Sequence, residues 1–253
     1  KTNILESIYV GTIGKSHRTN DTSDMLMFNA EEAGIVVKFE KKDTPQKVNI
    51  KLFRQGPKDI RLNDTKISQK ELIGTLNTVI FCPEDLQLIK GTPSGRRRFL
   101  DMEISQTSAT YYHQLMQYNR LLQQRNAVLK EYRGKNTIPL EEWDLQLADM
   151  ASFIVKKRLE SLKKINLLID LMNRKLTGGL ENLTIGYEQP YMDNGSLEYT
   201  KEGFYERIKA ALPQDRHRLS TSVGPHRDDL RFFSDAMDLK KFGSQGQQRT
   251  AVL

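Results

Sequence analysis

Two long amphipathic stretches, separated by a short break, limit most strongly what this chain can fold into. Residues 105–132 and 140–176 carry apolar side chains at alternating steps of three and four, which places them on one face of an α-helix. The break at residues 134–139 begins with glycine and ends with proline, and Gly178-Gly179 follow the second stretch. Because two long helices joined by a short loop pack antiparallel, we predict a helical hairpin.

The apolar side chains of this hairpin are predicted to form core rather than a cofactor site. Arg125 is the one interruption of the first stripe, and the second stripe slips once along its helix. The stripe positions are Tyr111, Leu115, Tyr118, Leu122, Leu129 and Tyr132 in the first helix, and Trp143, Leu147, Met150, Ile154, Leu162, Ile165, Ile169, Met172 and Leu176 in the second.

Short strands are predicted on both sides of the hairpin. Residues 34–40, 48–53 and 60–62 alternate in character and are rich in branched side chains, which predicts a small antiparallel sheet with turns at 41–46 and 63–64. The remaining expected elements are a buried strand at 78–82, a strand pair of 183–188 with 197–200 around a turn at 193–195, a helix at 203–212 ended by Pro213, and two strands at 230–233 and 237–242 that turn at 234–235.

The composition is that of a soluble globular protein, with 38% hydrophobic and 28% charged residues. The single cysteine, Cys82, cannot form an internal disulfide, and no apolar run is long enough to span a bilayer or to act as a signal peptide. We therefore expect a cytoplasmic protein with no membrane association. The net charge of +7 and pI near 9.3 favour a polyanionic partner.

The string Gly243-Ser244-Gln245-Gly246-Gln247-Gln248-Arg249 runs directly into an apolar helix start. A serine hydroxyl, backbone N–H groups left open by glycine, and the positive end of a helix together form an anion site. The alternative is an ordinary helix after a polar turn, with Ser244 as its N-cap. The string resembles the signature motif of ATP-binding-cassette ATPases. That resemblance implies that Ser244, Gln245, Gly246 and Gln247 contact a nucleotide held by a second subunit.

At the other end of the chain, Lys1-Thr2-Asn3 opens an apolar helix. Lys-Thr before such a helix is the end of a P-loop, whose glycines are not in this sequence. With that interpretation, Lys1 reaches the β- and γ-phosphates of ATP and the Thr2 hydroxyl binds Mg²⁺. The alternative is an amphipathic helix that happens to open with these residues. The chain starts and stops inside predicted helices, so we expect it to be part of a longer protein.

Four strings in order carry a closer resemblance. They are Lys-Thr-Asn-Ile-Leu-Glu-Ser-Ile from position 1, Gly-x-x-Gly-Lys-Ser-His-Arg-Thr from 11, Gly-x-Pro-x-x-Arg-Arg-Arg-Phe-Leu-Asp from 91, and Gly-Pro-His-Arg-Asp-Asp-Leu from 224. Together they resemble the RecF family of bacterial recombination mediators, which belongs to the cassette ATPases. The resemblance implies that Asn3, Ser16, His17 and Arg18 contact the nucleotide, whereas without it residues 11–19 would be a solvated basic loop.

The resemblance implies an α/β fold, namely an ABC-type P-loop ATPase head with an inserted, mainly helical arm domain. Residues 1–92 would be the first part of the head, 93–212 the arm, and 213–253 the second part of the head with the signature motif. One departure is the loop after residues 78–82, where related ATPases carry a coupling glutamine. Gln87 comes late there, and Glu84 or Asp85 are the replacements considered.

Several basic residues are candidates for DNA contacts. Arg96, Arg97 and Arg98 lie at a helix start, where the helix dipole disfavours positive charge. They are therefore expected to bind an anion: DNA phosphates, an acidic partner or carboxylates in internal salt bridges. Lys156 and Lys157 lie on the second long helix and are either a solvated face or DNA contacts. No role follows for the string at 224–229, although His226 lacks a partner His or Cys at metal-ligand spacing.

The resemblance implies an ATP-dependent homodimer that clamps double-stranded or gapped DNA and helps to load recombinase with RecR- and RecO-type mediators. ATP and Mg²⁺ would be the cofactors. A weak DNA-dependent ATPase activity is expected of the full protein but not of this chain, because the Walker B carboxylates are not in its sequence. The alternatives are a DNA-binding module without a nucleotide switch, a structural chromosome-maintenance head, for which an arm of about 120 residues is too short, and an overcoming-lysogenisation nuclease.

Overall fold

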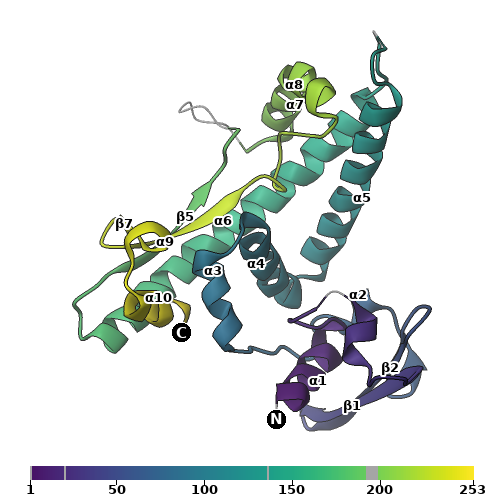
Figure 1. Cartoon of the computed structure of the whole chain (residues 1–253), viewed down its shortest axis with the longest axis vertical. Coiled ribbons are helices and arrows are strands. Elements are labelled where there is room, and N and C mark those ends of the chain that lie inside the picture. Colours follow the sequence, from purple (N-terminus) through teal and green to yellow (C-terminus); the bar gives the residue numbers. More distant parts are fainter. Residues whose placement is uncertain (1, 20, 136, 192–198) are drawn as a thin grey trace. The chain divides into compact units, whose positions relative to one another are not determined.

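A computed structural model describes residues 2–19, 21–135, 137–191 and 199–253 (Figure 1). The chain divides into two compact units. The first comprises residues up to 81 together with 105–109, and the second comprises 82–104 and 110–253. The second unit therefore draws residues from all three predicted stretches of the chain. The assignment of an ATPase head and an inserted arm stays a prediction.

The first unit is built on an antiparallel sheet with the strand order β1-β2-β3-β4. Its strands are β1 (Glu32–Lys41), β2 (Thr44–Phe53), β3 (Asp59–Leu62) and β4 (Thr65–Lys66). Lys42-Asp43 and Asn63-Asp64 form the two-residue turns, and all four residues have positive φ, as a type I′ hairpin turn requires. The predicted sheet is confirmed, and its first hairpin is tighter than expected because both strands extend to this turn.

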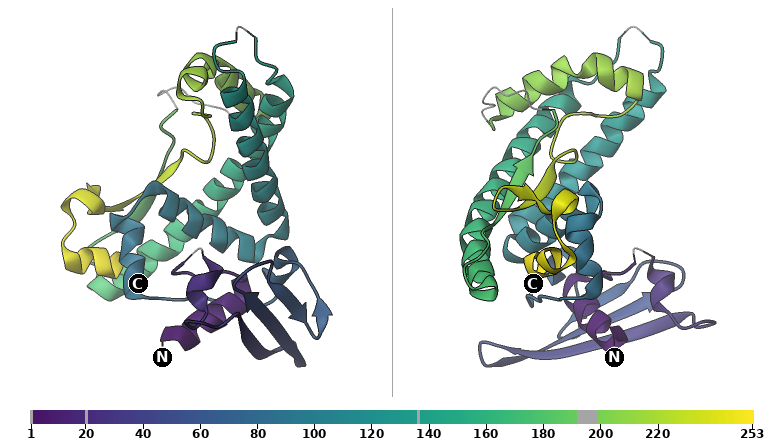
Figure 2. Two further views of the ribbon diagram at one scale, coloured as in Figure 1. Left: turned by 45° about the vertical axis from the view of Figure 1, so that its right-hand side comes forward. Right: turned by 60° about the vertical axis from the view of Figure 1, so that its left-hand side comes forward.

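Helix α1 (Thr2–Ile13) packs on one face of this sheet, where alternate strand residues form an apolar core (Figure 2). The helix lies so close to β1 that a Cβ at Gly11 would be only 2.3 Å from a methyl group of Val37. The prediction that a glycine-broken loop begins at Gly11 is therefore wrong, and Gly14, with φ of 76°, follows the helix instead. The short helices of this unit are η1 (Thr22–Met25) and α2 (Gln69–Leu72).

The two long helices are confirmed as α5 (Ala109–Glu131) and α6 (Glu141–Thr177), with Gly178 in the left-handed conformation after α6. The first helix begins later than predicted, because residue 108 separates α5 from α4 (Pro93–Thr107). α5 runs toward the connecting loop and α6 runs away from it, and the two helices splay apart, so they do not pack against each other along their length as predicted (Figures 1 and 2). Tyr111 and Tyr118 are buried in the core of the second unit, as predicted.

A second sheet has the order β5-β6-β7 and is antiparallel. Its strands are β5 (Leu183–Glu188), β6 (Asp229–Ser234) and β7 (Met237–Asp238). β5 pairs with β6 in full register, a partner that the prediction of a pair between 183–188 and 197–200 did not include. Of the predicted partner, 197–198 and the turn at 193–195 lie outside the described residues, and Thr200 is the N-cap of α7 (Lys201–Ala210).

Three other predictions need correction. Residues 78–82 form no strand, because no described strand pairs with them, and Val79 is 93% exposed. Pro213 does not end a helix but lies in the first turn of α8 (Leu212–Arg218), where its missing N–H costs nothing. Residues 239–242 are helical rather than extended. The remaining elements are η2 (Pro83–Leu86), α3 (Gln87–Lys90), α9 (Leu239–Phe242) and α10 (Gln245–Val252). No helix in the described part of the chain is long and apolar enough to cross a membrane.

Candidate functional site

The loop after α1 is organised by a buried serine. The Ser16 hydroxyl donates to the Glu6 carboxylate at 2.5 Å and accepts from the backbone N–H groups of Arg18 at 2.9 Å and Thr19 at 3.3 Å. Glu6 also forms an ion pair with the Arg18 guanidinium at 3.3 Å. The loop therefore folds back along α1 to its second turn.

This fold-back brings together residues from both ends of the helix. Thr2 and Glu6 are four residues apart on α1, so they are neighbours on its surface. Ser16 and Arg18, both bound to Glu6, consequently lie about one helical turn from Thr2. Thr2 and Asn3 are exposed in the first turn of α1, while Lys1 lies outside the described residues.

Two further basic side chains lie at this loop. The Lys58 ammonium donates to the Gly14 carbonyl, and burial together with the nearby charge of Lys15 lowers the pKa of Lys58. The His17 ring contacts Tyr9 edge-on, with centroids 5.4 Å apart, and its Nδ1 is buried without a hydrogen-bond partner. The exposed start of α1 at Thr2 and the Arg18 guanidinium beside Glu6 lie about one helical turn apart and suit a phosphate, whereas Lys58 lies at Gly14, after the opposite end of the helix. This arrangement is therefore compatible with the predicted ATP and Mg²⁺.

In the second unit, the signature string forms a sharply defined helix start. The Ser244 hydroxyl accepts from the Gln247 N–H at 3.2 Å, and the Gln247 side chain accepts from the Ser244 N–H at 2.9 Å, a reciprocal capping box. Gly243 is required before it, because a Cβ there would lie 2.6 Å from the Leu239 carbonyl oxygen. The predicted N-cap alternative is thus confirmed as a structural role.

The cap leaves part of the helix start open. The N–H groups of Gln245 and Gly246 have no acceptor within α10, because they belong to its first turn. The Gln247 amide is also held by Glu181 at 2.9 Å, and Gln248 donates to the Leu239 carbonyl at 2.7 Å. A fixed helix start with exposed donors can bind an anion, so both roles of Ser244 are compatible.

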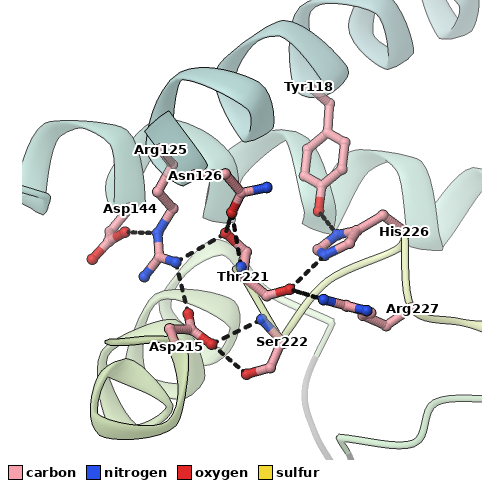
Figure 3. A network of polar contacts seen from close by, with 9 residues as sticks. All are labelled: Tyr118, Arg125, Asn126, Asp144, Asp215, Thr221, Ser222, His226 and Arg227. Carbon is pink, nitrogen blue, oxygen red and sulfur yellow. Dashed lines mark hydrogen bonds and ion pairs between the residues drawn. The ribbon is translucent and has the colours of Figure 1, made fainter. Parts of the chain in front are cut away.

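Arg125 and its partners form a buried ionic centre in the second unit (Figure 3). Arg125 is fully buried and donates to Asp144 and to Asp215, both at 2.6 Å, and to Thr221 at 2.9 Å. Asp215 also accepts from the Ser222 N–H at 2.9 Å. These contacts join α5, α6, α8 and the loop that follows α8. Arg125 therefore belongs to the buried face of α5 rather than interrupting it.

The string from Gly224 to Asp229 lies beside this centre. His226 bonds with the Tyr118 hydroxyl at 2.6 Å and the Thr221 carbonyl at 3.0 Å, and Arg227 donates to the same carbonyl (Figure 3). The Pro225 carbonyl accepts from the buried Arg158 at 2.7 Å. This string thus ties a loop to α5 and α6, a structural role that its sequence did not reveal.

The two aspartates of the string engage arginines and a tyrosine far away in sequence. Asp228 accepts from the Tyr187 hydroxyl and lies 3.7 Å from Arg158, while Asp229 holds Arg96 through two bonds of 2.7 and 2.8 Å. Arg158 also forms a two-bond pair with Asp101 at 2.9 Å. An arginine on an apolar helix face was the signal that could have predicted these contacts, because a buried guanidinium requires a buried carboxylate.

The DNA-contact candidates have different environments. Arg96 is buried and its guanidinium is engaged by Asp229, which matches the internal salt-bridge alternative. Arg97 is half-buried and donates to the Asp228 carbonyl at 2.6 Å. A further set lies nearer to solvent: Arg98 and Lys156 are exposed, and Lys157 pairs with Glu160 at 2.7 Å. DNA contact by these side chains stays a prediction.

Burial shifts two ionisable groups of the string in opposite senses. Burial raises the pKa of Asp228 to about 6, although the positive charge of Arg158 acts to lower it. It lowers the pKa of His226 to about 4, assisted by the charges of Arg227, Arg97 and Arg158. At neutral pH His226 is therefore neutral and can accept one hydrogen bond and donate another, as its contacts with Tyr118 and Thr221 require.

Replacing His226 with Gln is expected to change how stability depends on pH. In the unfolded chain the imidazole protonates near 6.5, whereas in the folded chain it protonates only near 4. The wild type therefore loses stability as pH falls through this window, by about 3 kcal/mol at 1.36 kcal/mol per pKa unit, and His226→Gln lacks this loss. Urea unfolding from pH 4 to 7 measures the difference between the two proteins, with exposed His217→Gln as the control. A difference that is constant over this range would contradict the assignment.

Comparison with known proteins defines the class. No family model matches the chain. It is 44% identical over 254 residues to the DNA replication and repair protein RecF of Clostridium botulinum strain Eklund 17B, covering all of this chain and 69% of the relative. It is 43% identical over 256 residues to RecF of Alkaliphilus oremlandii, covering 70% of that protein. A solved structure of the recombination mediator protein RecF-ATP in the RecFOR pathway superimposes with a TM-score of 0.90 at 32% identity, covering 99% of this chain and 69% of that one.

These similarities confirm the predicted α/β fold, which the chain shares with the solved RecF structures over 99% of its length. The chain belongs to the RecF family of DNA replication and repair proteins. Its relatives are named for DNA replication and repair, and the solved relative is named as a recombination mediator in complex with ATP.

Proposed function

We propose that this chain forms the nucleotide-responsive part of an ATP-driven dimeric clamp, which closes on double-stranded or gapped DNA and helps to load recombinase. The observation that carries the proposal is the match over 99% of the chain to a RecF structure whose name includes ATP. The two motif regions support it. One gathers Thr2, Ser16 and Arg18 around Glu6, and the other presents the open start of α10.

Each motif region has a distinct task in this clamp. Thr2 and the first turn of α1 hold phosphates and a Mg²⁺ ion, assisted by Lys1. Arg18, 46% exposed and held by a single carboxylate, adds positive charge beside them. Ser244 and the open N–H groups of Gln245 and Gly246 bind the nucleotide of a second copy. In this clamp the nucleotide joins the two subunits, because the first region of one subunit and the signature region of the other both contact it.

DNA binding and partner binding complete the proposal. Cations on the DNA-facing surface contact phosphates without reading sequence, as expected of a clamp. RecR- and RecO-type mediators are the proposed protein partners, by analogy with the RecFOR pathway of the solved relative. ATP hydrolysis in the full-length protein, a slow step, releases the DNA.

Duplex-DNA affinity of the full-length protein with and without ATP tests this function. We expect tighter binding with ATP, and we expect Ser244→Arg to remove the ATP effect, because a long side chain blocks the start of α10. An ATP-independent affinity would favour the alternative of a DNA-binding module without a nucleotide switch. Normal ATP-dependent dimerisation of Ser244→Arg would exclude the contact in trans.

A further inference from the structure

The sheet of the first unit has one face covered by α1 and one face in solvent. Side chains alternate between the two faces along each strand. Ile35, Val37, Val48 and Ile50 point to the α1 side, where they pack with the core. The solvent side carries five cations, here called the basic sheet face, contributed by all four strands: Lys38, Lys47, Lys51, Arg61 and Lys66.

The strand register brings these cations close together. Lys38 and Lys47 are direct partners across β1 and β2. Arg61 is the direct partner of Lys66, and Asn49, on the same face, is the partner of Arg61. Direct cross-strand partners have Cβ atoms about 5 Å apart. Like charges in this position destabilise a sheet, so the direct pairing of Lys38 with Lys47 has no structural benefit.

Carboxylates neutralise only part of this charge. Asp59 pairs with Arg61 at 2.8 Å and with Lys66 at 3.8 Å. Lys47 pairs with Asp64 in the turn at 3.3 Å, but that carboxylate is 74% exposed, so water and salt screen the pair. On the strands themselves the only other acidic residues of this face are Glu32 and Glu40, at the two ends of β1. The centre of the face is therefore positive.

We propose that the basic sheet face binds the phosphate backbone of duplex DNA. The proposal rests on the DNA-binding function proposed above and identifies a surface for it. Lys47 and Lys51 are four residues apart on β2, a span of about 13 Å. Duplex DNA carries one charge per about 1.7 Å of its axis, so a flat surface of this extent meets several phosphates at once. The long, flexible cation side chains need no particular base sequence.

The composition of the face favours DNA over a lipid surface. Membrane-binding surfaces combine cations with inserted apolar side chains. Val36, 53% exposed, is the one large aliphatic residue among the exposed side chains of this face. Asn49, at the centre, instead offers an amide N–H to a phosphate oxygen.

Salt-dependent DNA binding by Lys38→Gln/Lys47→Gln in the full-length protein tests the proposal. Each lost phosphate contact lowers the slope of log affinity against log salt by about 0.9, so we expect a slope smaller by about 2 and affinity weaker by roughly tenfold or more at 0.15 M salt. The matched control is Lys130→Gln/Lys201→Gln, which removes the same charge from exposed positions of the second unit. We expect its slope to equal that of the wild type.

Further measurements separate the possible outcomes. Urea unfolding of Lys38→Gln/Lys47→Gln should give a midpoint no lower than wild type, since a like-charge pair is removed. An unchanged salt slope, or the same change in both double variants, would overturn the basic sheet face as the DNA site. Loss of binding to phosphatidylserine vesicles with unchanged DNA binding would also overturn it. If ATP has no effect on wild-type affinity, the clamp fails but the changed slope still supports this surface.

Discussion

Replacing Arg125 with Met is expected to destabilise the chain by about 3–5 kcal/mol. The guanidinium is fully buried between Asp144 and Asp215, and Asp215 is itself completely buried. Removing the cation leaves two carboxylates without their counter-charge, and burial already raises the pKa of Asp144 against the effect of Arg125. Chemical unfolding at pH 7 measures the loss, which we expect as a large shift of the midpoint.

A charge-free version of the same centre separates ionic from packing effects. In Arg125→Met/Asp144→Asn/Asp215→Asn no charge remains, while the amide oxygen at position 215 still accepts the hydrogen bonds from Ser222. We expect the triple variant to be more stable than Arg125→Met, because the unpaired charges cause most of the loss. Lys157→Met, which breaks an exposed pair with Glu160, is the control and should cost less than about 0.5 kcal/mol. A cost below about 1 kcal/mol for Arg125→Met would contradict the argument.

Arg125 also shows what the helical periodicity did and did not predict. The spacing of apolar residues correctly predicted both long helices and the burial of Tyr111 and Tyr118. The same spacing treated Arg125 as an interruption, although it lies on the buried face. Periodicity specifies which face a residue occupies. It does not specify the carboxylates that neutralise a cation there, and Asp215 lies 90 residues away.

Strand pairing illustrates a second limit. The turn signal at 193–195 favoured a local hairpin for 183–188, but β5 pairs with β6, whose first residue is Asp229. The β6 partner has Leu230 and Phe232 facing the core, and a turn signal near 183–188 carries no information about so distant a strand. The strand prediction for residues 78–82 failed for a related reason, because an apolar run forms a strand only when a neighbouring strand pairs with its backbone.

The candidate site was predictable where its roles are local. Ser244 as an N-cap depends only on the residues that follow it, and the structure confirms the cap. The contact of Ser16 and Arg18 with Glu6 was not predicted, because it requires the loop to fold back on α1. The string at 224–229 depends on Arg96 and Arg158, whose positions are set by the packing of α4 and α6.

Replacing Ser244 by Asp and by Ala is expected to separate its two roles. Asp caps a helix as well as Ser does, and its charge suits a helix N-terminus, so Ser244→Asp should leave stability nearly unchanged. The same carboxylate faces the phosphates of a nucleotide bound in trans, so we expect ATP-dependent dimerisation to weaken more than tenfold. Ser244→Ala should instead lose about 1 kcal/mol of stability, since Gln247 loses its acceptor.

In Ser244→Ala the open N–H groups of Gln245 and Gly246 remain, so dimerisation with ATP should stay within a few-fold of wild type. Thermal unfolding and sedimentation of the full-length protein with ATP should therefore rank the two variants in opposite orders. If Ser244 acted only as a cap, Ser244→Ala would be both the less stable variant and the one that dimerises more weakly, because dimerisation would then follow helix stability. The reversal depends on charge at the helix start, and a purely structural cap does not produce it.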